Sequence, residues 1–278
     1  MKFSLNQATT KYWPMEELVR GLLDAGVGAA GLWREDVTAY GLERTASLMR
    51  ESGLVVSSLC RGGFFHRPDW LDDNRRAIDE AAALGTDTLV LVSGGLPEGS
   101  RDIDGARRHV GEAIGRLVDH ASAAGVRLAI EPLHPMFCSD RCVVATLSQA
   151  LTLASPYPAS AVGVCVDTYH LWWDDTVWEQ LRAHPDRIAA FQLADWITPL
   201  PAGVLTGRGL PGTGCVDLAR FSRAVTEAGY TGWTEVEVFN EEVWARPGAE
   251  VLADVIRELS LPNGQSLPKG QSLPKSQS

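Results

Sequence analysis

Lysine is scarce in this chain of 278 residues, and its four lysines are Lys2, Lys11, Lys269 and Lys275. A Schiff-base enzyme needs a lysine amine inside its pocket. Lys2 opens the chain, and two of the others lie close to its end. Only Lys11 could reach an active site, so Schiff-base aldolase chemistry is not expected.

Long apolar runs, a disulfide framework and an excess of positive charge are also missing. No apolar stretch approaches the about 18 residues of a membrane helix, and the first residues lack the apolar core of a signal peptide. The five cysteines form no CxxC motif, which favours free thiols. The net charge of −10 disfavours nucleic-acid binding. We therefore expect a cytoplasmic protein with no nucleic-acid or membrane partner, and the sequence leaves open whether it is a homo-oligomer.

Short β-like runs alternate with amphipathic helical stretches along the chain. Several helical stretches end on glycine, as left-handed helix caps do, and each glycine leads quickly into an apolar run. The predicted strands are 2–5, 28–33, 55–60, 88–92, 126–130, 162–166, 188–193 and 233–238. The predicted helices are 15–25, 42–52, 70–84, 103–124, 147–154, 177–183, 218–228 and 249–259.

Eight strand–helix units predict a single α/β domain, a (β/α)8 TIM barrel, over residues 1–259. An open doubly wound sheet would show the same alternation, but no G-x-G-x-x-G follows the first strand. Residues 260–278 differ, because Ser, Leu, Pro and Gln recur there with a period of six. Such a composition predicts a disordered, dispensable tail.

Oxygen-bearing side chains end four consecutive predicted strands. Glu131 follows 126–130, Asp167 follows 162–166, Gln192 follows 188–191 and Glu237 follows 233–236. The carboxyl ends of barrel strands converge on one mouth, where this fold keeps its chemistry. Oxygen donors gathered there suit a divalent metal ion.

Five segments together resemble the xylose isomerase-like superfamily of sugar isomerases and epimerases. They are 131–135 (EPLHP), 167–173 (DTYHLWW), 192–196 (QLADW), 208–212 (RGLPG) and 235–239 (EVEVF). Each segment alone is weak evidence, but their order and placement are typical of that superfamily. The resemblance covers essentially all of residues 1–259.

The resemblance implies roles for four acidic or basic residues. Glu131 matches a glutamate that binds the metal and handles a substrate proton. Asp167 matches the second ligand, and Glu237 matches the last ligand and second acid–base residue. His170 resembles a histidine that orients the substrate. Glu131, Glu237 and His170 are therefore the candidate catalytic residues.

Gln192 departs from the best-known relatives, which carry histidine at this position. Its carbonyl oxygen would complete an all-oxygen ligand set with Glu131, Asp167 and Glu237. Such a set favours Mn²⁺ or Mg²⁺ over Zn²⁺. The alternative is a buried glutamine that only hydrogen-bonds Asp195.

Four residues are candidates for substrate binding. Arg208 matches an arginine that contacts Glu237 or substrate oxygens in the family, with a solvated loop residue as the alternative. His134 would line the pocket or lie in a loop. Trp172 would form a wall or pack beneath it, and Arg61 follows the third strand and could reach the pocket. The glycines at 62–63 and 207–209 could cradle a phosphate, but the sequence does not show whether the substrate has one.

This constellation predicts a metal-dependent isomerase or epimerase that acts on a sugar, a keto-sugar or a cyclitol. A carboxylate would remove a proton next to a carbonyl, and the metal would stabilise the resulting enediolate. The runner-up is a lyase of the same superfamily, either inosose dehydratase-like or cleaving a keto-glycoside. A non-catalytic sugar-binding protein is a weaker alternative. The charge and the six histidines argue against an abasic-site endonuclease.

Overall fold

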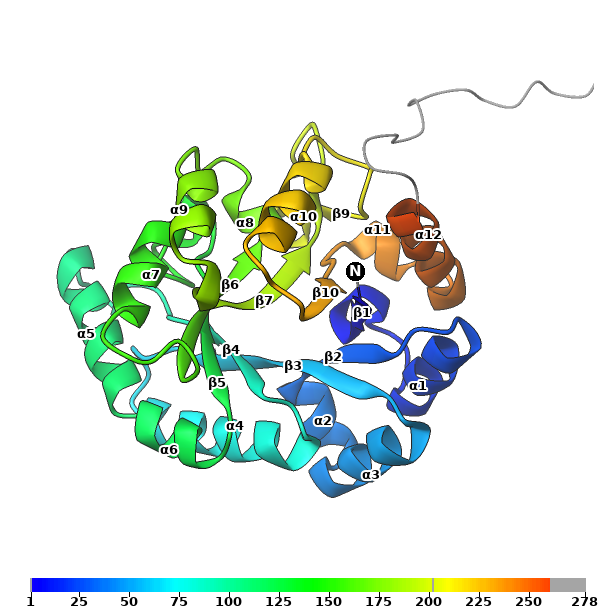
Figure 1. Ribbon diagram of the computed structural model, residues 1–278, viewed down its shortest axis with the longest axis horizontal. Coiled ribbons are helices and arrows are strands. Elements are labelled where there is room, and N and C mark those ends of the chain that lie inside the picture. Colours follow the sequence, from blue (N-terminus) through cyan, green and yellow to red (C-terminus); the bar gives the residue numbers. More distant parts are fainter. Residues whose placement is uncertain (1, 202, 261–278) are drawn as a thin grey trace, which may run out of the picture.

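Eight parallel strands close into a barrel in the computed structural model, which describes residues 2–201 and 203–260. Around the barrel the strand order is β1-β10-β7-β6-β5-β4-β3-β2. The main helices form a ring outside the strands (Figure 1). The predicted (β/α)8 TIM barrel is therefore confirmed.

The barrel strands match the apolar runs of the sequence to within a few residues. Their bounds are β1 Lys2–Asn6, β2 Ala29–Trp33, β3 Val55–Gly63, β4 Thr88–Val92, β5 Arg127–Ile130, β6 Val162–Asp167, β7 Ile188–Leu193 and β10 Trp233–Val236. Small buried residues fill part of the interior: Cys60, Val90, Ala129, Cys165 and Ala190. The larger apolar core lies between the strands and the helices, as expected for a sheet covered by helices.

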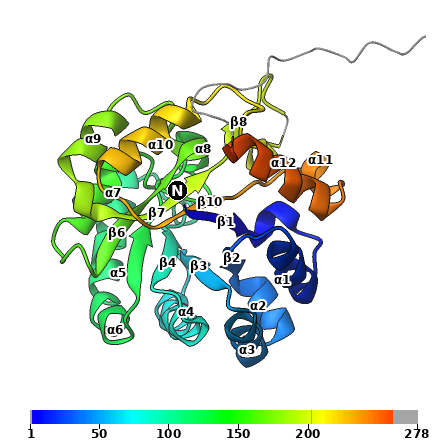
Figure 2. The same cartoon turned by 45° about the vertical axis from the view of Figure 1, so that its right-hand side comes forward.

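The helices alternate with these strands, and Figure 2 shows them from a second direction. Their bounds are α1 Met15–Asp24, α2 Arg34–Tyr40, α3 Leu42–Ser52, α4 Trp70–Leu84, α5 Ile103–Gly115, α6 Val118–Ala123, α7 Leu147–Ala154, α8 Thr168–Leu171, α9 Val177–Ala183, α10 Leu218–Glu227, α11 Glu241–Trp244 and α12 Gly248–Ser260. Short 3-10 turns are η1 Gln7–Thr10, η2 Pro135–Phe137, η3 Pro185–Arg187 and η4 Val204–Thr206. No helix within the described part of the chain is long and apolar enough to cross a membrane.

The single helix predicted over 103–124 is wrong, because the chain breaks there into α5 and α6. α5 ends at Gly115, where a Cβ atom would lie 2.8 Å from the Tyr157 hydroxyl. Glycine weakens a helix, and a side chain at this position would require the Tyr157 hydroxyl to shift. The apolar periodicity continues through the break, so the sequence alone did not show it.

Two short strands outside the barrel carry part of the mouth. β8 Asp195–Trp196 pairs antiparallel with β9 Arg208–Gly209. This pairing brings Arg208 back towards the end of β7, and Arg208 is buried there. At the other end of the chain, Ser260 of the predicted tail is the last residue of α12, and 261–278 lie outside the described residues.

Candidate active site

The four oxygen-bearing residues lie at the carboxyl ends of four neighbouring barrel strands. Glu131 follows β5, Asp167 ends β6, Gln192 lies near the end of β7 and Glu237 follows β10. All four side chains are buried. Buried carboxylates need partners or must remain protonated, so their surroundings decide what they can do.

Arg208 joins two of these carboxylates. Its Nη1 atom lies 2.8 Å from Asp167 Oδ2 and 2.9 Å from Glu237 Oε2. Because one nitrogen contacts both oxygens, the two carboxylates converge on the same point. Their negative charges, together with that of Glu131, raise the pKa of the buried guanidinium despite the opposing effect of burial. Arg208 is thus not a solvated loop residue.

His170 faces the same cluster from α8, one turn beyond Asp167. Its Nε2 atom lies 4.0 Å from Glu131 Oε1, 3.9 Å from Asp167 Oδ2 and 3.0 Å from Arg208 Nη2. Its Nδ1 lies 3.2 Å from the backbone N–H of His134, which donates to it. Burial, and then the charge of Arg208, hold the pKa of His170 well below its usual range. The imidazole is therefore neutral at neutral pH.

Glu131 is the least satisfied member of the cluster. Among the described residues, its Oε1 atom is buried and has no hydrogen-bond partner. Burial, together with the charges of Asp167 and Glu237, raises the pKa of Glu131 well above its usual range. An unpaired buried carboxylate oxygen beside two further acids is where a cation would fit.

The donor atoms of Glu131, Asp167 and His170 lie within 4.8 Å of one another, close enough to hold one metal ion. Glu237 Oε2 shares its arginine contact with Asp167 Oδ2 and so adjoins this group. Burial raises the pKa of Glu237 to about 7, with Arg208 opposing the shift and Asp167 adding to it. These residues fit a divalent metal ion.

Gln192 is bound one layer deeper than the other three. Its Nε2 donates to Glu235 Oε1 at 3.0 Å, and its Oε1 accepts from the Cys165 thiol at 3.3 Å. Within 2–201 and 203–260 its side chain makes no hydrogen bond to Glu131 or Glu237. Asp195 is not its partner either, because the Asp195 carboxylate accepts from the backbone N–H groups of residues 196, 214 and 216. The alternative of a glutamine that only hydrogen-bonds Asp195 is therefore excluded in that form, because Gln192 bonds Glu235 and Cys165 instead.

Glu235 forms the centre of that deeper layer. Its carboxylate accepts hydrogen bonds from Asn6, Ser57, Ser58 and Gln192. Gly31 faces it so closely that a Cβ there would lie 2.5 Å from its carboxyl group. Glu235 is thus fully paired, in contrast to Glu131.

Aromatic rings wall one side of the mouth. The His134 ring lies 5.6 Å from Trp173 and 5.0 Å from Trp196, between centroids. Trp172 packs against Trp196 at 5.3 Å. Tyr169 stacks on Trp196 at 4.9 Å. His134 and Trp172 therefore belong to one wall whose centre, Trp196, was not predicted although it lies in the 192–196 segment.

Arg61 is separate from the carboxylates, at the end of β3. Among residues 2–201 and 203–260 its one ion pair is with the exposed Glu35, at 3.9 Å, and its guanidinium lies 5.3 Å from the Trp33 ring. Cys60, just before it, was not predicted as a site residue, although its thiol lies 3.8 Å from Glu237 Oε1.

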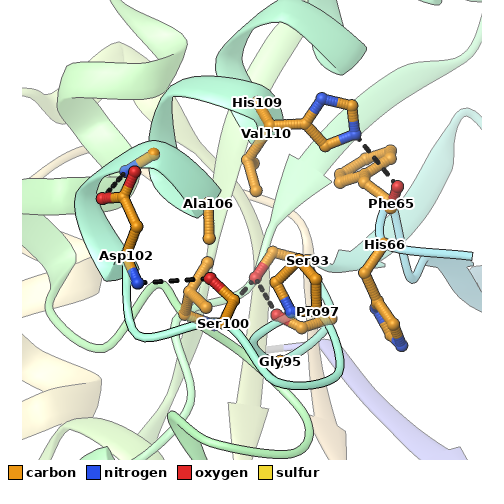
Figure 3. Close-up of a pocket in the computed structure, with 13 residues that line it drawn as sticks. Phe65, His66, Ser93, Gly95, Pro97, Ser100, Asp102, Ala106, His109 and Val110 are labelled. Carbon is orange, nitrogen blue, oxygen red and sulfur yellow. Dashed lines mark hydrogen bonds between the residues drawn. The ribbon is translucent and has the colours of Figure 1, made fainter.

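A second pocket of about 170 Å³ lies between the end of β4 and α5 (Figure 3). Several of its polar side chains already have hydrogen-bond partners. Ser93 donates to the Gly94 carbonyl, His109 contacts the Phe65 carbonyl at 3.1 Å, and Asp102 caps α5 through the Gly105 N–H. It contains none of the predicted site residues.

The chain belongs to the xylose isomerase-like TIM barrel family, whose model matches residues 19–259. One curated relative is the 3-dehydroshikimate dehydratase of Pseudomonas putida, 31% identical over 199 residues, which are 68% of this chain and 29% of that protein. Another is the inosose isomerase of Bacillus subtilis, 28% identical over 145 residues, about half of each chain. The chain therefore spans half or less of these two relatives.

Solved structures share the fold over most of the chain. Protein SMc04130 of Sinorhizobium meliloti is 44% identical, with a TM-score of 0.89 over 92% of this chain and 96% of that one. The IOLI protein, whose structure is described with a zinc atom, is 21% identical, with a TM-score of 0.79 over 93% of this chain and 96% of that one. The second likeness shows the fold alone.

Proposed function

We propose that this protein is a divalent-metal-dependent isomerase or epimerase that removes a proton next to the carbonyl of a sugar, keto-sugar or cyclitol. One observation carries this proposal. Three buried carboxylates, Glu131, Asp167 and Glu237, gather with His170 and Arg208 at the barrel mouth. Relatives named as an isomerase and a dehydratase support the same class of chemistry.

The metal would be held by Glu131, Asp167 and Glu237, with Gln192 as the fourth ligand. The unpaired Oε1 of Glu131 supports this set. Gln192 would have to exchange its contact with the Cys165 thiol for the metal, and a thiol is a weak donor to give up. When bound, the metal would stabilise negative charge on the substrate carbonyl oxygen. Oxygen ligands favour Mn²⁺ or Mg²⁺, although the zinc of the IOLI structure keeps Zn²⁺ as a competitor.

Glu237 is suited to move the proton. A carboxyl group with a pKa of about 7 is present in both protonation states near neutral pH, which is the condition for acid–base catalysis. Glu131 would act on the other side of the substrate. Two such groups give epimerisation if they work on opposite faces, and isomerisation if one of them returns the proton to the neighbouring carbon.

His170 and Arg208 would bind and orient the substrate oxygens. A neutral imidazole can donate one hydrogen bond to a hydroxyl group without adding charge. The positive charge of Arg208 offsets the negative charges of Asp167 and Glu237, so Arg208 would keep these carboxylates close together before a substrate binds. The aromatic wall around Trp196 would cover an apolar face of the sugar ring.

A lyase is the second candidate, favoured by the similarity to a dehydratase. The same proton removal becomes an elimination when a hydroxyl group leaves from the next carbon. A protonated Glu237 or Glu131 could give that hydroxyl its proton. Only the product separates the two reactions.

The test is a panel of free keto-sugars, inososes, keto-glycosides and cyclic keto acids, each with Mn²⁺, Mg²⁺ or Zn²⁺ in D₂O. Proton abstraction incorporates deuterium next to the carbonyl, which NMR detects before any product is identified. A product of unchanged composition indicates an isomerase or epimerase, and one that has lost water indicates a lyase. A protein that binds no metal and exchanges no proton on the panel would contradict the proposal and favour a non-catalytic sugar-binding protein.

A further inference from the structure

Three arginines lie around the mouth without carboxylate partners to match them. Arg61 lies near the end of β3, Arg67 lies in the loop after it, and Arg141 lies in the loop after β5. Among the described residues, the one ion pair of Arg61 is the 3.9 Å contact with Glu35, which is an exposed side chain. Within the part of the chain that the structure describes, Arg67 and Arg141 have no ion pair. In a chain with a net charge of −10, this is an unusual local excess of positive charge.

Arg34 is a buried arginine with carboxylate partners, and it serves as a comparison for Arg61. Its side chain is 13% exposed and is paired with both Asp73 and Glu80. Those hydrogen bonds raise the pKa of Arg34 although burial opposes them. Arg61 is almost as buried, at 22% exposed, and its side chain donates no hydrogen bond to any described residue. Five N–H donors are thus left without a protein acceptor.

Aromatic rings hold the Arg61 guanidinium in place. It lies 4.4 Å from the Phe64 ring and 5.3 Å from the Trp33 ring. Arg67 lies 4.4 Å from the same Phe64 ring. A cation–π contact fixes the plane of the guanidinium while its N–H edges stay free to bind another group. Arg61 is therefore preorganised for an acceptor that the described part of the chain does not supply.

Ring and loop contacts connect these arginines to the candidate active site. The Trp33 ring that Arg61 faces lies 5.3 Å from the Phe239 ring, and the Arg208 guanidinium lies 5.2 Å from the same Phe239 ring. Gly94 pairs with Cys142, the residue after Arg141, and a Cβ on Gly94 would lie 3.1 Å from the Phe64 Cα atom. The loop that carries Arg141 therefore lies close to the Phe64 segment that holds Arg61. Burial lowers the pKa of Arg61, and the positive charges of Arg141 and Arg67 act in the same direction against Glu35.

The backbone N–H groups of two loop glycines are not available to bind an anion. The Gly63 N–H is donated to Asn74 Oδ1 at 2.6 Å, and the Gly207 N–H to the Val204 carbonyl at 3.2 Å. The glycine segments at 62–63 and 207–209 therefore do not offer free N–H groups at these two positions. The side chains remain as the anion-binding groups.

We propose that the substrate carries an anionic group, a carboxylate or a phosphate monoester, and that Arg61 binds this group with Arg67 and Arg141 beside it. This inference rests on the proposed function, because it names the class of substrate for the same site. A planar guanidinium with free N–H edges matches the oxygens of either anion in a two-point contact. The acids that hold the metal and the arginines that hold the anion would then bind opposite ends of one molecule.

The test compares two matched pairs of compounds: quinate with methyl quinate, and ribulose 5-phosphate with ribulose. Affinities are measured calorimetrically with the full chain, both metal-free and with Mn²⁺. For at least one pair, the charged member should bind at least about tenfold more tightly than its neutral partner. A preference in the first pair identifies a carboxylate, and one in the second identifies a phosphate.

The variant Arg61→Gln should lose most of that preference while its affinity for the neutral members and for Mn²⁺ stays within about threefold, since only the charge-assisted contact is removed. The preference of Arg61→Lys for the charged compound should be intermediate between that of the parent and that of Arg61→Gln. Arg20→Gln removes an equal charge from the exposed face of α1 and should change nothing. If Arg61→Gln fails to fold, the variants Arg67→Gln, at an exposed position, and Arg141→Gln, at a half-buried one, test the same preference.

The inference is overturned if neither charged compound binds more tightly than its neutral partner, or if Arg61→Gln weakens both members of a pair equally. The proposed function fails separately. A protein that keeps an Arg61-dependent preference but binds no metal supports the anion site alone. A protein that exchanges protons of neutral keto-sugars with Mn²⁺ and shows no charge preference supports the function and not the anion site.

Discussion

Gln192 donates a hydrogen bond from its side-chain amide to Glu235 Oε1, at 3.0 Å. The amide nitrogen donates and the carboxyl oxygen accepts, so the nitrogen of Gln192 faces Glu235 and its oxygen is turned to the Cys165 thiol. This hydrogen bond connects the proposed metal ligand Gln192 to the deeper layer of hydrogen-bonded groups around Glu235. It also gives the glutamine two separable roles, as a metal ligand and as a donor to Glu235.

Two variants of Gln192 separate these roles. Gln192→His should fold and bind Zn²⁺ relatively more tightly against Mn²⁺ than the parent does, because imidazole prefers the later metals. Gln192→Leu should lose metal affinity and also about 1–3 kcal/mol of stability, because Glu235 loses a donor. Titration of the three proteins with both metals, and their denaturant unfolding, measure this. If both variants keep the parent's ratio of Zn²⁺ to Mn²⁺ affinity and lose no metal affinity, the carboxylates hold the metal and Gln192 is not a ligand.

Glu237→Gln should reduce turnover by about 10²–10⁴-fold, the usual contribution of a general acid or base. It should also weaken metal binding, because an amide replaces a charged ligand. Glu242→Gln, an exposed acid on α11, is the matched control and should behave as the parent. Turnover of Glu237→Gln within a few-fold of the parent would exclude Glu237 as the base.

Stability without metal should fall as the pH rises from about 4.5 to about 7. Burial raises the pKa of Glu237 to about 7 in the folded protein, whereas an unfolded glutamate has a pKa of about 4.3. Between these values the folded state binds more protons than the unfolded state, so raising the pH favours unfolding. The raised pKa of Glu131 acts in the same direction.

Thermal melts of metal-free protein at pH 5 and pH 7.5 test this, with Glu237→Gln as the control that should lose part of the pH dependence. Mn²⁺ should stabilise the protein more at pH 7.5 than at pH 5, because metal binding displaces these protons. An equal metal-induced shift at both pH values would show that the acids are already ionised at pH 5.

Arg208→Met should destabilise the metal-free protein by about 3–5 kcal/mol, because Asp167 and Glu237 lose their buried cation. Mn²⁺ should then raise the melting temperature of this variant more than that of the parent. Arg208→Lys keeps the positive charge, and its stability without metal should lie between that of the parent and that of Arg208→Met. Equal stability of Arg208→Met and the parent without metal would mean that the carboxylates are protonated there and need no cation.

The order of the elements could be read from the sequence, because it depends on local properties. Apolar runs, amphipathic periodicity and glycine caps act over short stretches, and β4 was predicted at the bounds Thr88–Val92 that the structure shows. The positions of Glu131, Asp167 and Glu237 followed, since a residue that ends a parallel barrel strand must lie at the mouth. The sequence by itself therefore determined the fold and the three carboxylates.

Only the tertiary structure decided which groups meet. Arg208 contacts Asp167 across 41 positions of chain because β9 pairs with β8, and nothing local to either residue encodes that distance. Gln192 pairs with Glu235 rather than Asp195 because β7 and β10 lie side by side in a register that sets those two residues opposite each other. Arg61 lies in β3 and Arg141 lies in the loop after β5, so only the fold brings them to the same end of the barrel. Contacts between residues far apart in the sequence set these relationships. The local periodicity of apolar residues carries no information about such contacts.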